Sequence, residues 1–99
     1  MSYRIIYSPG AKQQLHALTA RQQRIVVDAV DTQLRHQPLL ETRNRKSMRS
    51  NPLAPWVLRV GNLRVYYDVG DRPECVVFVC AIGVKQRNRV IFEREEFEL

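Results

Sequence analysis

The stretch that decides the fold covers residues 56–69 and reads Trp-Val-Leu-Arg-Val-Gly-Asn-Leu-Arg-Val-Tyr-Tyr-Asp-Val. Gly61-Asn62 is a two-residue turn signal between two alternating runs, so the stretch predicts a β-hairpin. Because side chains alternate along a strand, the hairpin has one apolar face and one cationic face. The apolar face consists of Trp56, Leu58, Val60, Leu63, Val65 and Tyr67. The other face consists of Val57, Arg59, Arg64, Tyr66 and Asp68.

The predicted register places Arg59 directly opposite Arg64. Like charges directly across a ladder destabilise it, so stability alone gives little reason to place two arginines there. An anion held between the two guanidinium groups explains the pair. The hairpin therefore predicts an anion-binding site as well as a fold.

The chain has 99 residues, and we expect residues 1–99 to form a single domain with a modest core. No apolar run approaches the length of a membrane span, and the first ten residues lack the apolar segment of a secretory signal. Cys75 and Cys80 lie five apart on one predicted strand and so face opposite sides, while His16 and His36 are distant from both in sequence. These features predict a cytoplasmic protein with reduced thiols, no metal and no cofactor.

Positive charge is concentrated in one part of the chain. The net charge is +6, and residues 43–89 hold ten basic but three acidic side chains. Arginine outnumbers lysine thirteen to three, and the guanidinium fork suits bidentate contact with phosphate. Such a patch is an electrostatic footprint for nucleic acid. A solvated basic surface and a docking patch for an acidic protein are the alternatives.

The segments around the hairpin predict the fold class. Residues 3–7 alternate weakly as a strand, and Ser8 with Pro9 begins a short helix. Thr19 has capping-box spacing and opens a second, amphipathic helix, which Pro38 ends. Residues 39–55 carry no periodic pattern, residues 75–82 are apolar on both faces like a central strand, and residues 90–92 form a short edge segment. The predicted order is β-α-α-β-β-β, an α+β fold with a helical hairpin on one face of a small, mostly antiparallel sheet.

This order resembles the RelE/ParE superfamily of bacterial toxins over nearly the whole chain. The residues that carry the resemblance are the Trp-x-Leu-Arg-Val-Gly-x-x-Arg-Val-x-Tyr hairpin and a late Gly-x-Lys-x-Arg segment. The resemblance implies the toxin of a type II toxin–antitoxin module, with a cognate antitoxin protein as partner. RelE-type members cut mRNA on the ribosome, whereas ParE-type members poison DNA gyrase. The fold is common to both and does not choose between them.

A residue-by-residue comparison with the family is mixed. Arg59 and Arg64 match the two family arginines on this hairpin, and the second of these contacts the scissile phosphate in RelE-type nucleases. Lys85 falls where those nucleases commonly carry another catalytic arginine, and Arg87 matches a nearby basic position. Three residues of the best-studied ribonuclease branch are missing here. Two lysines and a late tyrosine of that branch would fall near Pro55 and Val57 and at Ile91.

Cleavage by a ribose 2′-hydroxyl needs a base, an acid and cations that stabilise the charge on phosphorus. Arg59 and Arg64 suit only the last role, because arginine does not deprotonate in proteins. Lys46 or Lys85 is a candidate base where like charges crowd it, and Tyr66 is a candidate for acid–base exchange or for stacking. The candidate catalytic set is Arg64, Arg59, Lys85, Lys46 and Tyr66. The candidate RNA-binding set is Arg43, Arg45, Arg49, Arg87 and Arg89, of which Arg49, like Lys46, could replace missing charge.

Three hypotheses follow. The first is a ribosome-dependent mRNA endonuclease, with ribosome and mRNA as partners beside the antitoxin. The second is a gyrase poison, and the third is a degenerate toxin that only binds its antitoxin. Arg59 and Arg64 could also serve an acidic antitoxin segment, or pair with Asp68. The acidic tail over residues 93–99 is either a frayed end or a segment that shields the cationic face.

Overall fold

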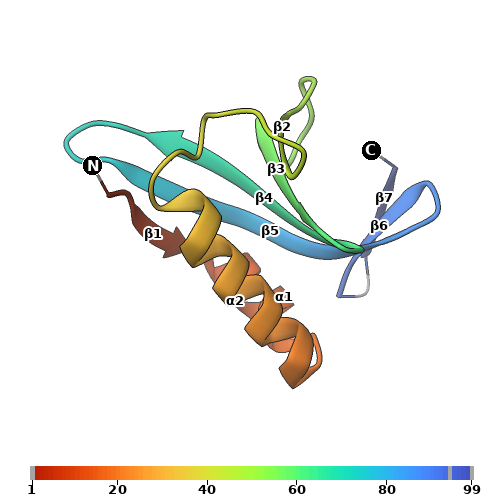
Figure 1. The fold of residues 1–99 in the computed structure, drawn as a ribbon. Coiled ribbons are helices and arrows are strands. Elements are labelled where there is room, and N and C mark those ends of the chain that lie inside the picture. The colour runs from red at the N-terminus through yellow and green to blue at the C-terminus, as the bar shows by residue number, and fades with distance from the viewer. Residues whose placement is uncertain (1, 94, 99) are drawn as a thin grey trace.

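The computed structural model describes residues 2–93 with their side chains and the backbone of residues 95–98. Within this part, two helices cover one face of a seven-stranded sheet (Figure 1), which confirms the predicted α+β class. The helices are α1 (Pro9–His16) and α2 (Ala20–Leu34). The strands are β1 (Arg4–Tyr7), β2 (Arg45–Ser47), β3 (Trp56–Val60), β4 (Leu63–Gly70), β5 (Val76–Gln86), β6 (Arg89–Phe92) and β7 (Glu95–Glu98).

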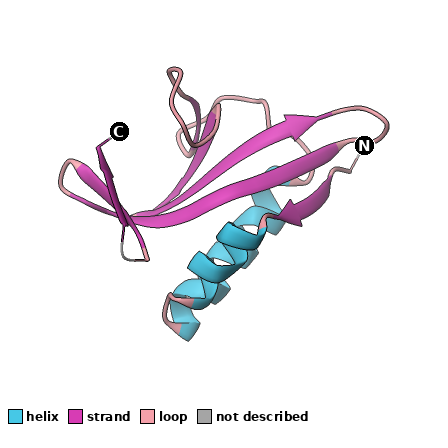
Figure 2. Ribbon diagram, turned by 180° about the vertical axis from the view of Figure 1, so that it is seen from behind, coloured by secondary structure: helices cyan, strands magenta, loops and turns pink. Residues whose placement is uncertain are grey.

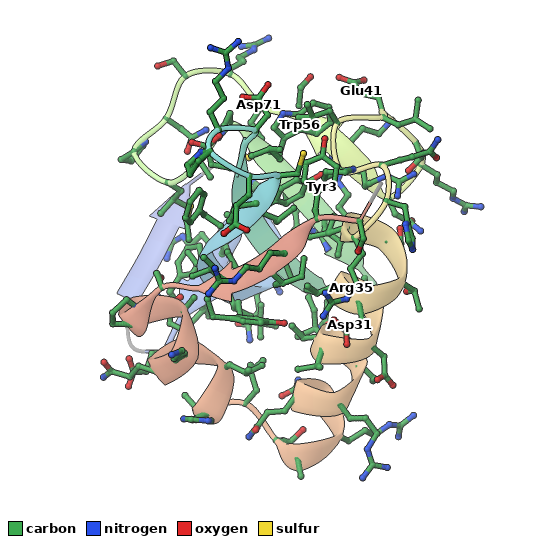
Figure 3. The ribbon with its side chains drawn as sticks, turned by 90° about the vertical axis from the view of Figure 1, so that its left-hand side faces the viewer. Tyr3, Asp31, Arg35, Glu41, Trp56 and Asp71 are labelled. Atoms are coloured by element: carbon green, nitrogen blue, oxygen red, sulfur yellow. The ribbon has the colours of Figure 1, made fainter. Side chains whose placement is uncertain are left out.

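Both helices begin at the residues that the sequence predicts. The Ser8 hydroxyl accepts a hydrogen bond from the Ala11 N–H at 3.0 Å, and Pro9 occupies the first turn of α1. Thr19 and Gln22 form a reciprocal capping box at the start of α2, with both bonds at 3.1 Å. The second helix is tied to the first strand, because the Tyr3 N–H donates to the Arg35 carbonyl at 2.6 Å. Figure 3 shows this end of α2, with Arg35 beside Asp31 and near Tyr3.

The sheet has the order β2-β3-β4-β5-β6-β7, with all these neighbours antiparallel and β1 parallel to β5. The register of the β3–β4 hairpin is the predicted one and pairs Arg59 with Arg64. Its apolar face packs on the helices, where Leu58 and Val65 are fully buried. Trp56 anchors the start of the hairpin by stacking on Tyr67 at 6.1 Å between ring centroids. Figure 2 shows the helices together on this one side of the sheet.

The observed strands correct three parts of the predicted order. Residues 39–55 contain the three-residue strand β2, which is too short to show a period in sequence. The central strand runs on to Gln86, well beyond residue 82. The tail is not frayed along residues 95–98, because β7 pairs with β6 through its backbone. Whether the acidic tail shields the cationic face lies outside the described side chains.

A β-bulge at Cys80 decides which face of β5 meets the arginines. Tyr66 pairs with Ala81 but Tyr67 pairs with Val79, so Cys80 is the extra residue. Alternation is reset at this point, since a one-residue shift moves every later side chain to the other face. As a result Gly83 and Lys85 lie on the face of Arg64, away from the helices.

The face of the sheet opposite the helices, which carries Arg59 and Arg64, is only partly open. The loop between β2 and β3 rises on the side of the sheet opposite the helices (Figure 1). Its residues Met48, Leu53 and Ala54 pack on this face, leaving Val57 5% and Tyr66 2% exposed. A second, smaller core therefore forms under the loop and frames the site described next.

Candidate functional site

One hollow on the open face gathers all five candidate catalytic residues together with Arg49. It has a volume of about 400 Å³, and we call it the cationic pocket. The sheet register explains the convergence, because Lys46, Val57 and Tyr66 form one cross-strand row and Arg59 with Arg64 forms another. The pocket is lined by Lys46, Ser47, Met48, Arg49, Ser50, Asn51, Val57, Arg59, Arg64, Tyr66, Lys85 and Val90.

The hairpin turn aims Arg64. Its Nη1 group donates to the carbonyl oxygens of Gly61 at 2.7 Å and Leu63 at 2.9 Å. The carbonyl between them, on Asn62, accepts the Lys85 N–H at 2.7 Å, so the same turn also fixes β5 where it carries Lys85. A guanidinium has five N–H donors in a rigid fork, so Arg64 keeps donors for a ligand after these two contacts.

The two arginines repel each other without a carboxylate between them. Burial and the neighbouring Arg59 charge both lower the pKa of Arg64, yet an arginine remains protonated in a protein. The ion pairs formed by the described residues are Arg4–Glu74 and Arg35–Asp31, neither of which lies in the pocket. The alternative pairing with Asp68 is therefore wrong for the described structure. Asp68 instead accepts the Val69 N–H at 2.7 Å.

Tyr66 lines the cationic pocket but is almost completely buried. The side chain is 2% exposed, and its ring packs against Phe92 with a centroid distance of 5.5 Å. Burial raises the pKa of Tyr66 to about 12, although Arg64 and Arg59 act in the opposite direction. The phenol is therefore protonated at neutral pH and suited to donate a proton or a hydrogen bond. A ring covered in this way leaves little face for a base to stack on.

The segment that carries Lys46 in β2 and Arg49 in the following loop is held on both sides by residues that sequence analysis missed. At one end the Ser47 hydroxyl donates to the Glu41 carboxylate, which holds the pKa of Glu41 below its usual range. At the other end Asn51 donates to the carbonyls of residues 49 and 54 at 2.7 and 3.0 Å. Its side-chain oxygen accepts the N–H groups of residues 53 and 54 at 2.8 and 3.1 Å. The Asn-Pro step at residues 51–52 was the sequence signal for this turn.

Two of the candidate RNA-binding arginines lie outside the cationic pocket on the β2 side. Arg45 pairs with Leu58 and so belongs to the helix-covered face. Its guanidinium donates to the Leu40 carbonyl at 3.0 Å and to the Gln33 carbonyl at 2.5 Å, at the end of α2. Arg43 is exposed in the turn before β2. Arg45 thus has a structural contact of its own, and neither arginine lines the cationic pocket.

The other two candidates surround a second hollow at the β5–β6 turn. Arg87 and Arg89 do not continue the strand of Lys85, because β5 ends at Gln86 and β6 begins at Arg89. Arg87 lies in the turn itself. We call this hollow the turn site, and it is lined by Gln86, Arg87, Asn88, Arg89 and Ile91. Ile91, at the position of the missing tyrosine, therefore lies outside the cationic pocket.

Gly83 allows β6 to close over the edge of the cationic pocket. A Cβ atom at Gly83 would lie 2.7 Å from Val90 Cγ1 and 2.9 Å from the Ile91 carbonyl oxygen. Such a contact is too close for any side chain, so only glycine permits this approach. The close approach brings Val90 beside Lys85 in the pocket wall. Gly83 belongs to the family-like Gly-x-Lys-x-Arg segment, but its close packing against β6 could not be predicted from the sequence.

The described residues contain no cluster of three or more histidine, cysteine, aspartate or glutamate side chains arranged to hold a metal ion. None of the helices in the described part is long and apolar enough to cross a membrane.

No protein-family model matches the sequence, and no curated protein matches it. Among solved structures, the chain is similar to one in the crystal structure of the toxin–antitoxin complex RelBE2 from Mycobacterium tuberculosis. The TM-score is 0.73 at 24% sequence identity, over 86% of this chain and 100% of that one. At this level of identity the likeness establishes the architecture and leaves activity open. The chain therefore has the RelE-like α+β fold that its hairpin predicted.

Proposed function

We propose that this chain is the toxin of a type II toxin–antitoxin module and that it cleaves mRNA on the ribosome. The observation that carries the proposal is the convergence of three arginines, two lysines and a protonated tyrosine in one pocket. Each of these residue types has a role in phosphodiester cleavage by the adjacent ribose 2′-hydroxyl. That reaction has an internal nucleophile, so the chain's own side chains suffice for it.

The arginines supply the electrostatic part of this chemistry. The turn carbonyls hold the guanidinium of Arg64 in place through two hydrogen bonds, and Arg59 is its cross-strand neighbour. A phosphate between them relieves their mutual repulsion and accepts charge-assisted hydrogen bonds from both. As the 2′-oxygen attacks, negative charge grows on the phosphate oxygens, and donors that are already in place stabilise it without reorganisation.

The remaining groups supply the proton transfers. Lys46 and Lys85 line the pocket from β2 and β5, on either side of the β3–β4 hairpin. A lysine in its neutral form accepts the 2′-hydroxyl proton, and the other, as an ammonium ion, stabilises negative charge. The Tyr66 hydroxyl, with its pKa raised to about 12, is a protonated donor for the departing 5′-oxygen. The products of this step are a 2′,3′-cyclic phosphate and a free 5′-hydroxyl.

The partner follows from charge and from the structural likeness. The similar solved structure is a toxin–antitoxin complex, which supports an antitoxin partner for this chain. Ten basic side chains over residues 43–89 suit an acidic antitoxin segment. Ribosome and mRNA as further partners, and a cytoplasmic location, belong to the same proposal.

A gyrase poison is the second candidate, and one observation favours it. Tyr66, the aromatic side chain in the pocket wall, is nearly covered, and the position of the family's stacking tyrosine is Ile91, outside the pocket. A poison that acts on gyrase needs no base-stacking platform. A degenerate toxin that only binds its antitoxin likewise needs no aromatic residue for stacking on a base.

Translation reactions with the purified chain separate these candidates. We expect codon-phased cuts in translated messages, mapped as new 5′ ends, with gyrase supercoiling unaffected in a parallel reaction. Arg64→Gln should abolish the cuts, whereas Arg24→Gln, which removes an exposed arginine from the helical face, should leave them intact. Intact messages with broken DNA would assign the gyrase role, and no effect in either assay would support the degenerate toxin.

A further inference from the structure

Two turns of this chain share a positive φ at their first residue but differ in the identity of that residue. The β3–β4 turn is Gly61-Asn62 and the β5–β6 turn is Arg87-Asn88, each joining two antiparallel strands through two residues. The first residue has a φ of 57° in both turns. Where the first turn has glycine, the second has arginine.

Glycine is the residue that this position favours. A φ near +57° lies in the left-handed region, which an L-amino acid with a long side chain seldom adopts and glycine adopts freely. Asparagine follows in both turns, so the local sequence differs only at the residue that bears the strain. Non-glycine residues held in this region cluster at functional sites. Arg87 therefore adopts an unfavourable backbone conformation, and a favourable interaction of its side chain with a ligand would explain why glycine does not occupy this position.

The surroundings of Arg87 suit an anion. The side chain is exposed, and none of the ion pairs formed within the described residues involves it. The turn site around it has a volume of about 600 Å³ and is lined mainly by polar and basic side chains. Its strand residues Gln86, Arg89 and Ile91 lie on the helix-covered face of the sheet, whereas Lys85 lines the cationic pocket on the open face. An RNA strand that reaches both hollows therefore passes around the β5–β6 turn, which carries Arg87 two residues beyond Lys85.

We propose that the turn site is a second phosphate subsite, in which Arg87 binds a neighbouring phosphate of the RNA strand held in the cationic pocket. The inference rests on the proposed function and deepens it. The ligand class is a single strand with at least two phosphates within reach, so a lone phosphate occupies only the cationic pocket. Arg87 is then a binding residue whose contact is made along the strand and away from the reacting atoms.

The test compares ligands of one and several phosphates on Arg87→Gly, Arg87→Lys and Arg24→Gln proteins. The probes are inorganic phosphate and a non-cleavable 2′-O-methyl oligoribonucleotide of six nucleotides. Arg87→Gly should leave phosphate binding unchanged, weaken hexamer binding roughly tenfold at 50 mM salt and reduce the slope of log K against log salt by about 0.7. Because glycine relieves the backbone cost, its melting temperature should match or exceed that of the wild type. Arg87→Lys should retain most of the hexamer affinity.

Two results would overturn the subsite. In one, Arg87→Gly binds the hexamer as tightly and with the same salt slope as Arg24→Gln. In the other, Arg87→Gly melts well below the wild type, which would make Arg87 a structural residue. The proposed function fails by a different result, since it requires Arg59 and Arg64 for phosphate binding and cleavage whatever Arg87 does.

Discussion

Replacing Arg59 by glutamine should stabilise the protein and remove its response to phosphate. Arg59 is exposed and lies opposite Arg64 in the ladder, with no carboxylate between them among the described residues. Glutamine keeps much of the side-chain length and removes the charge. It is a cleaner change than one at Arg64, whose hydrogen bonds to the turn carbonyls would also be lost.

The magnitude follows from the geometry. Directly opposed like charges destabilise a ladder by about 0.2–1 kcal/mol, and solvent screening at an exposed site favours the lower half of that range. For a domain of this size, each kcal/mol corresponds to a shift of about 4–8 °C. Arg59→Gln should therefore melt about 1–4 °C above the wild type at low salt. Phosphate at a hundred times its dissociation constant should stabilise the wild type by about 2.7 kcal/mol, or roughly 10–20 °C.

The assay is calorimetric unfolding of both proteins at 10 mM and 300 mM sodium chloride, each with and without phosphate. The difference between the proteins without phosphate should shrink at the higher salt, and the variant should lose most of the phosphate shift. A variant that melts below the wild type at low salt and still responds fully to phosphate would refute the reasoning. The two arginines would then be structural rather than an anion clamp.

Two further predictions concern the frame of the pocket. Gly83→Ala should destabilise the protein by about 1–3 kcal/mol in denaturant unfolding, because the new Cβ would lie 2.9 Å from the Ile91 carbonyl; an unchanged midpoint would contradict the close packing of β6. The pKa of Tyr66 is about 12 in the folded state against the ordinary value of 10.0, so the folded state holds the phenolic proton more strongly. The contribution of Tyr66 to the free energy of unfolding is therefore complete below pH 10 and is lost as the pH rises towards 12. Tyr66→Phe should reduce the alkaline loss of unfolding free energy by roughly 2–3 kcal/mol relative to wild type, and identical pH profiles would contradict the burial of this hydroxyl.

The fold was predictable where local signals and long-range packing agree. The hairpin register follows from the Gly61 turn and the alternation around it, and both helix starts follow from their capping residues. The bulge at Cys80 and the strand β2 have no comparable signal. A bulge depends on how two strands meet, and a three-residue strand is too short to have a period. Both the bulge and the short strand therefore depend on tertiary packing rather than on local sequence.

The candidate site was predictable for the residues that the hairpin carries and less so for those brought by other segments. Arg59, Arg64 and Tyr66 share a face because alternation demands it. Lys85 joins them only through the bulge, since unbroken alternation along β5 would point it at the helices. Arg45 lies on the other face from Lys46, because the charge of a sequence segment does not reveal which face each side chain takes. Neighbouring residues of β2 face opposite ways.

The pocket consists of groups that are individually unfavourable for the folded chain. In the pocket, Arg59 opposes Arg64 and Tyr66 is buried beside them, while Arg87 occupies a left-handed turn position outside it. The two hydrophobic cores on either side of the sheet offset these local costs. A chain that merely bound its antitoxin through this face would be stabilised by losing Arg59 or by a glycine at residue 87. That Arg59, Arg64 and Tyr66 nevertheless line one pocket favours an anion site over a degenerate one.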